Sequence, residues 1–154
     1  MQNKLNIIGL IFLFISCKFS PDNIRYGFDE CSYCRMTIVD NTHSSQFITS
    51  KWKSYNFDSI ECMLDYLYEN NDTNYLKKND KILMLVSNFK SPGKMLNVKD
   101  AKFLISKKIS SPMGANISAF SSIEEILEID NSGEIIDWNN LIENYNILNK
   151  NNAN

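Results

Sequence analysis

The 154-residue sequence contains only one histidine and three prolines, and it has no stripe of basic residues. Lysine and arginine are scattered along the chain, which argues against nucleic acid as a partner. The formal charge of -2 favours cationic ligands only mildly. His43 is the only imidazole available to a metal site. Apolar residues make up 44% of the chain, which is sufficient for a globular core.

The one extended apolar run, Ile7–Ile15, is too short to cross a bilayer, which needs about 20 apolar residues. It follows a positively charged Lys4, so residues 1–16 are predicted to be a secretory signal peptide. The run ends in Phe-Ile-Ser-Cys17, which resembles the lipobox of bacterial lipoproteins. This resemblance implies that Cys17 carries a lipid and begins the mature chain. The alternative is a plain signal peptide, with an ordinary thiol at Cys17.

Without Cys17, an odd number of cysteines remains: Cys31, Cys34 and Cys62. Outside the cytosol, this leaves at least one thiol that no internal disulfide can pair. A ligand role explains such a thiol better than chance does. Residues 17–29 are expected to be the lipidated cysteine and a polar tether.

The stretch Cys31-Ser-Tyr-Cys34-Arg-Met36 carries the chemistry of this sequence. Its thiols and thioether are soft ligands, which select Cu(I), zinc or iron–sulfur centres over hard cations. A redox Cys-x-x-Cys motif should open a helix after a strand, and the residues before Cys31 are not strand-like. We therefore rank thiol catalysis low and expect a protein that is not an enzyme.

The main alternative is a structural zinc site of the Cys₃His type, formed by Cys31, Cys34, Cys62 and His43. Met36 favours copper, because Cu(I) accepts thioethers and zinc does not use them. A second thioether, Met113, lies in a Ser-Pro-Met-Gly turn that should expose it. Packing in the core is the alternative role for both methionines. His43 is a secondary candidate, since a single histidine is more often an ordinary polar residue.

Hydrophobic patterning predicts a chain of short strands with two helices. The strands are expected at residues 36–39, 46–50, 54–57, 82–86, 103–106 and 117–120. One helix should follow Asp58 as N-cap, with Glu61 completing a capping box, and another should follow Ser122. At about 100° per residue, Cys62 points away from the apolar stripe of the first helix.

The segments Phe57–Leu64 and Phe120–Leu127 are identical at five of eight positions. Both are placed at a strand-to-helix junction, which indicates an internal duplication. We predict an α+β fold of two similar strand-strand-helix-strand units. The first unit, 30–75, contains Cys-x-x-Cys-x-Met, and the second, 76–145, contains Ser-Pro-Met-Gly. Residues 146–154 are expected to form a disordered tail.

Three segments together resemble the NosL family of nitrous oxide reductase accessory lipoproteins. They are Cys31–Asp40, Tyr55–Met63 and Ser111–Gly114. The resemblance extends over most of residues 28–142, and the lipobox agrees with it. It implies an α+β fold with two similar halves.

The resemblance also implies a function. Family members are periplasm-facing, lipid-anchored copper chaperones that bind one Cu(I) and deliver it to nitrous oxide reductase. An ABC-transporter system assists the assembly of the reductase's copper-sulfide centre. The family's thiolate and thioether ligands match Cys34 and Met36. Met113 is the expected third ligand, with His43 as runner-up, and Cys31 is expected to share the metal during transfer.

Overall fold

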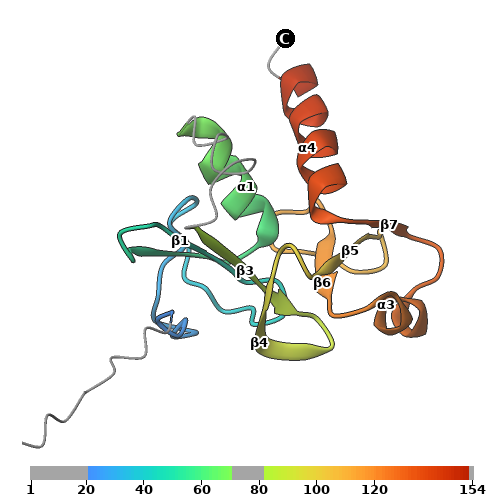
Figure 1. The fold of residues 1–154 in the computed structure, drawn as a ribbon, viewed down its shortest axis with the longest axis horizontal. Coiled ribbons are helices and arrows are strands. Elements are labelled where there is room, and N and C mark those ends of the chain that lie inside the picture. Colours follow the sequence, from blue (N-terminus) through green and yellow to red (C-terminus); the bar gives the residue numbers. More distant parts are fainter. Residues whose placement is uncertain (1–20, 71–81, 153–154) are drawn as a thin grey trace, which may run out of the picture.

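The computed structural model describes residues 21–70 and 82–152, which form a mixed seven-stranded sheet with helices packed against it (Figure 1). The first elements are β1 (Ser45–Ile48), β2 (Ser54–Phe57), α1 (Ile60–Glu69), β3 (Leu83–Asn88) and β4 (Ser91–Asn97). The remaining elements are β5 (Lys102–Ile105), β6 (Ile117–Phe120), α3 (Ile123–Ile129), β7 (Glu134–Ile136) and α4 (Trp138–Asn152). The predicted α+β class is confirmed.

Apart from β4, the sheet consists of two copies of one strand-strand-helix-strand unit. In the first copy the strand order is β2-β1-β3 with α1, and in the second it is β6-β5-β7 with α3. The copies join where β3 pairs in parallel with β6, with Asn88 opposite Ala119. The duplication that the repeated segments indicate is therefore present in the fold. The first copy ends with β3, so it continues beyond the boundary expected at residue 75.

Several local expectations differ from the structure. Residues 36–39 make one isolated bridge, between Glu30 and Thr37, and form no strand. Strand β4 was not predicted, because Pro92 and Gly93 indicate a turn. It pairs with β3 at the side of the sheet path, a position where a strand tolerates proline. Residues 146–152, expected as a disordered tail, continue helix α4.

Residues 22–29, expected as a tether, are attached to the domain. The Gln46 side-chain amide donates to the Asp22 carbonyl over 2.7 Å, and the hydroxyls of Tyr26 and Ser44 are 2.8 Å apart. Any tether therefore ends before Asp22. Cys17 and the predicted signal peptide lie outside the described residues. Within those described residues, the structure has no helix with the length and apolarity needed to cross a membrane.

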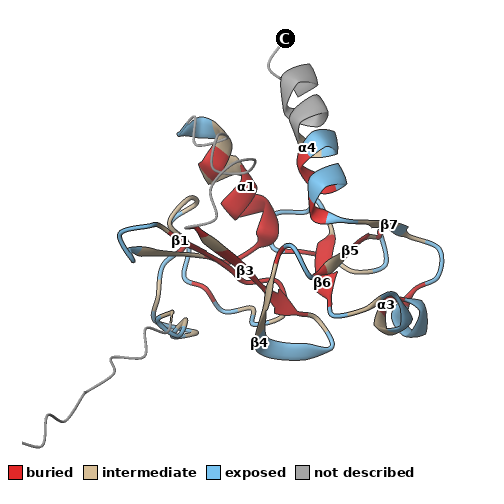
Figure 2. Cartoon of the chain, viewed as in Figure 1, coloured by how far each residue is buried: buried red, intermediate tan, exposed pale blue. Residues whose placement is uncertain are grey.

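The core lies between the sheet and the lower parts of α1 and α4, which stand side by side (Figure 2). The hydroxyl of Tyr145 on α4 donates to Asp65 on α1 over 2.8 Å. Of the apolar stripe predicted for α1, Ile60, Met63, Leu64 and Leu67 are buried, and Tyr68 is partly buried.

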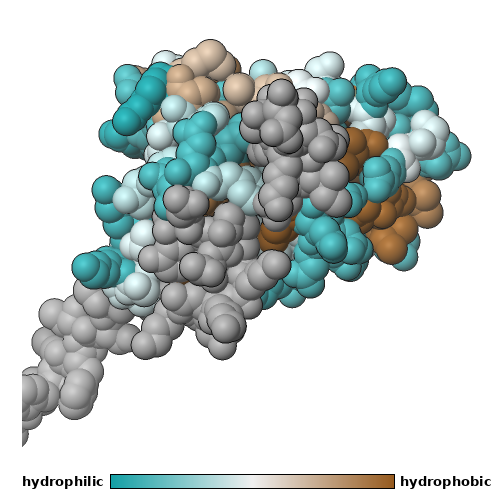
Figure 3. Space-filling model, turned by 90° about the horizontal axis from the view of Figure 1, so that it is seen from above, coloured by the Kyte–Doolittle hydropathy of each residue, from teal (hydrophilic) through white to brown (hydrophobic). Residues whose placement is uncertain are grey.

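Helix α3 is packed more loosely than α1. Only its Ile126 is buried. Ile123, Leu127 and Ile129 are exposed. A hydrophobic patch is visible on the right of the face drawn in Figure 3. Ile123 and Leu127 are uncovered because no further layer packs on this helix in the part of the chain that is described.

The N-cap of α1 is Ser59, one residue later than predicted. Its hydroxyl accepts a hydrogen bond from the Cys62 amide over 3.1 Å. We expect Ser59→Ala to lower the free energy of unfolding by about 1 kcal/mol, the usual cost of losing a cap. Urea unfolding measures this loss. An unchanged unfolding midpoint would contradict the assignment of the cap.

Candidate metal centre

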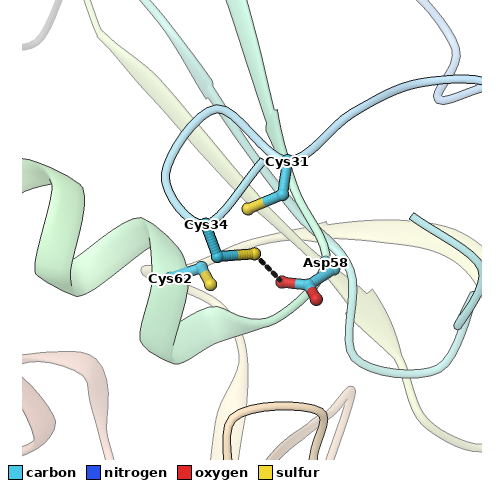
Figure 4. A group of neighbouring side chains, drawn as sticks. All are labelled: Cys31, Cys34, Asp58 and Cys62. Atoms are coloured by element: carbon cyan, nitrogen blue, oxygen red, sulfur yellow. Dashed lines mark hydrogen bonds between the residues drawn. The ribbon is translucent and has the colours of Figure 1, made fainter. Parts of the chain in front are cut away.

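Cys31, Cys34, Asp58 and Cys62 converge on one point, with one ligand atom of each lying within 4.8 Å of the others (Figure 4). Cys31 and Cys34 belong to the loop before β1, Asp58 follows β2, and Cys62 lies in the first turn of α1. Cys31 and Cys62 are fully buried, whereas Cys34 is half-buried. The three thiols are free. We call these four residues the thiol cluster.

The loop that carries the first two thiols is held closed by its backbone. The Cys31 amide donates to the Met36 carbonyl over 2.8 Å, and the Arg35 amide donates to the Cys31 carbonyl over 3.1 Å. Arg35 has a φ of 67°, a left-handed conformation that is uncommon outside glycine. The Ser32 amide donates to the Asn56 carbonyl over 2.7 Å, which ties the loop to β2. These contacts hold Cys31 and Cys34 over the start of α1.

Cys62 becomes part of the site because this loop covers the side of α1 opposite the apolar stripe. The rotation of about 100° per residue correctly placed Cys62 away from that stripe. The sequence alone could not show that Cys31 and Cys34 would lie beside Cys62, because this depends on how the loop packs on the helix. Asp58 was assigned to capping α1. Since Ser59 has that role, the Asp58 carboxylate is available to the cluster, and its Oδ1 accepts from Cys34 Sγ over 3.8 Å.

The thiols of the cluster differ in acidity. A hydrogen bond from the Cys62 thiol, opposed in part by burial, lowers the pKa of Cys31 to about 6. The same hydrogen bond, together with burial, raises the pKa of Cys62. Burial also raises the pKa of Cys34. Within the metal-free cluster, Cys31 is therefore the thiol that deprotonates most readily, and a thiolate is the form that binds a soft metal ion.

We expect the ultraviolet absorbance of the metal-free protein to show one thiolate forming with a midpoint pH of about 6. Cys62→Ala should raise that midpoint towards the ordinary value of 9.0, because it removes the hydrogen-bond donor. The depressed pKa of Cys31 stabilises the fold fully above pH 9.0, and this contribution is lost as the pH falls through about 6. A midpoint that Cys62→Ala does not move would contradict this account.

The two predicted thioether ligands are exposed. Met36 follows Cys34 by two residues and is 52% exposed. Met113 is 42% exposed, as its turn predicted, and a hydrogen bond of 3.1 Å from the Gly114 amide to the Ser111 carbonyl closes this turn. The Ser111 hydroxyl donates to the carboxylate of Glu61, the neighbour of Cys62. The second unit thus places its Met113 turn beside the first turn of α1. The ligand roles of both methionines stay predictions.

His43 lies outside the thiol cluster. It is 3% exposed, and both ring nitrogens have partners. Nδ1 is 2.7 Å from Asp40 Oδ2, and Nε2 is 3.0 Å from Ser118 Oγ on β6. The imidazole therefore connects the two units, and in the structure Asp58 occupies the fourth position that the zinc hypothesis gave to His43.

Since both ring nitrogens serve the fold, His43→Ala should leave metal affinity unchanged. It should lower the free energy of unfolding by about 1–3 kcal/mol, because Asp40 and Ser118 lose their buried partner. Chemical unfolding and metal titration of the same preparation measure both quantities. A loss of metal affinity without a loss of stability would make His43 a ligand.

Comparison with known proteins identifies the family. The family model named NosL matches residues 26–145, which is most of the chain. The chain belongs to the NosL family. Its fold is similar to a solved structure described as the copper chaperone NosL from Shewanella denitrificans, with a TM-score of 0.59 and 19% identity. That match covers 79% of this chain and 92% of the other, and at this identity it shows a shared fold. A search of curated proteins found no match.

Proposed function

We propose that this NosL-family protein is a Cu(I)-binding metallochaperone. The observation that supports this most strongly is the thiol cluster, in which three sulfur atoms and one carboxylate oxygen lie within 4.8 Å of one another. A set of thiols selects soft ions, and Cu(I) is the ion that also accepts the thioethers of Met36 and Met113. The structural relative described as a copper chaperone supports the same function.

A chaperone must release its cargo as well as bind it. The half-buried Cys34 and the exposed Met36 and Met113 would let the ligands of a partner replace those of the chaperone one at a time. Soft, low-coordinate Cu(I) exchanges among sulfur ligands without any change in oxidation state. In this role the protein binds and hands over an ion and catalyses no reaction.

We propose further that the protein is anchored by a lipid on Cys17 in the bacterial envelope, facing the periplasm. Its client is nitrous oxide reductase, whose copper-sulfide centre is assembled with an ABC-transporter maturation system. Membership of the NosL family and the lipobox-like sequence at Cys17 support this proposal. Mass spectrometry of the protein from membranes tests the anchor. It should find diacylglycerol and an acyl chain on Cys17, and a mature protein without lipid would contradict the anchor.

A structural zinc site is a second candidate, because the three thiols and Asp58 also make an acceptable tetrahedral zinc set. This alternative predicts that removing the metal unfolds the domain, since binding energy would then be folding energy. The extended apolar core between sheet and helices argues against such a dependence.

Parallel anaerobic titrations with Cu(I) and Zn(II) distinguish the two functions, with thermal unfolding of the metal-free protein as a companion measurement. We expect one tightly bound Cu(I), weaker zinc, and a metal-free protein that unfolds cooperatively. Tight zinc, weak copper and unfolding on chelation would reject the chaperone and establish a structural zinc site.

A further inference from the structure

We infer that Cu(I) has two positions in this protein and that Cys34 belongs to both. In the inner position the ligands are the thiolates of Cys31, Cys34 and Cys62. In the outer position they are the Cys34 thiolate and the thioethers of Met36 and Met113. This inference rests on the proposed copper function and states where the ion is stored and where it is handed over.

The inner position follows from burial and distance. The sulfur atoms of Cys31 and Cys62 have no access to solvent, yet both lie within 4.8 Å of the Cys34 sulfur. Figure 4 shows the three side chains directed towards one another. A small soft ion bound among them would gain three thiolate bonds. The ligands of a partner protein could not reach it there, so the inner position suits storage and not transfer.

The outer position follows from exposure. Cys34 is the only thiol of the cluster that is not fully buried. Arg35, whose backbone is in the left-handed conformation, lies between Cys34 and Met36 in the sequence, and Met36 is 52% exposed. The turn of Met113, which is 42% exposed, is attached to the first turn of α1 through the hydrogen bond between Ser111 and Glu61. The inference therefore assigns these two exposed thioethers to the one thiol of the cluster that is in contact with solvent.

Movement of the ion between these positions is a ligand exchange. The copper bonds to the Cys31 and Cys62 sulfurs break while bonds to the Met36 and Met113 sulfurs form, and the bond to Cys34 persists. Copper remains Cu(I), so the step needs neither oxidant nor reductant. The Cys31 and Cys62 sulfurs leave the ion as thiolates, and solvent supplies any proton that they take up.

Two purified variants test the inference. One is the double variant Met36→Leu with Met113→Leu, and the other is Cys62→Ser. Leu127→Ala, an exposed residue of α3, is the control. A colorimetric Cu(I) chelator measures both the affinity at equilibrium and the rate at which it removes Cu(I).

We expect the double variant to change the Cu(I) affinity by less than about tenfold, because the three thiolates of the inner position remain. It should release Cu(I) more slowly than the wild type, because the thioethers of the outer position are lost. Cys62→Ser should weaken binding by at least about tenfold and speed release, as expected for a change at the site itself. Loss of Cu(I) binding in the double variant, or unchanged affinity and rate in Cys62→Ser, would overturn the inner position.

Cys62 is buried, so Cys62→Ser could disturb folding, which thermal unfolding of the metal-free variant detects. In that event the double variant decides the question alone, since both of its substitutions are at exposed positions. A wild-type protein that binds no Cu(I) would overturn the proposed function as well. Tight binding that depends on the methionines and not on Cys62 would overturn only the two-position inference.

Discussion

Cys34→Ser is expected to abolish tight Cu(I) binding while leaving the fold intact. A serine hydroxyl is a hard, neutral ligand and does not replace a thiolate on a soft ion. In the two-position inference Cys34 is the ligand common to both copper positions, so no other residue compensates for its loss. Anaerobic titration against a Cu(I) chelator measures the effect.

The fold should tolerate this change, because Cys34 is half-buried and its hydrogen bond to Asp58 is long at 3.8 Å. The metal-free variant should therefore unfold at the same temperature as the metal-free wild type. Ser32→Ala, two residues earlier in the same loop, is a matched control that should keep Cu(I) binding. Retained tight binding in Cys34→Ser would show that the copper site lies elsewhere.

Phe57→Ala is expected to be the most destabilising substitution near the site. Phe57 is fully buried at the end of β2, and its ring lies 5.4 Å from that of Tyr66 on α1. Truncating such a buried ring removes about 3–5 kcal/mol of stability through lost burial and the cavity left behind. Urea unfolding measures this loss.

The substitution should also weaken metal binding, because Phe57 directly precedes Asp58 and packs against the helix that carries Cys62. Leu127→Ala provides the contrast, since a residue that is 52% exposed should change stability by less than about 1 kcal/mol. Equal effects of the two substitutions would contradict the assignment of Phe57 to the core.

The parts of the fold that local patterns determine could be predicted from the sequence. The apolar stripe of α1 and the repeated Phe-x-Ser-Ile-Glu junction led to one helix and to the two related units. Strand β4 could not be predicted, because Pro92 and Gly93 carry turn signals and only the long-range pairing with β3 makes the segment a strand. The last residues of α4 were predicted to be a tail because their asparagines are poor helix formers.

The candidate site was predicted in part. The spacing of Cys31 and Cys34 is local, so both were found directly. Cys62 and Asp58 join them through the packing of a loop on a helix, which no spacing rule contains. Asp58 was also not considered as a ligand, because the capping-box pattern had assigned it as the N-cap of α1. The ligand role of His43 stays a prediction, and its sequence position did not reveal its hydrogen-bond partners Asp40 and Ser118.

X-ray absorption at the copper edge of the Cu(I)-loaded protein tests the central claim most directly, because it reports both the oxidation state and the ligand atoms. The thiol cluster predicts copper that remains Cu(I) and is surrounded only by sulfur, with the signal lost in Cys34→Ser. Scattering from an imidazole ring would place His43 at the metal and contradict the assignment of the site to these thiols.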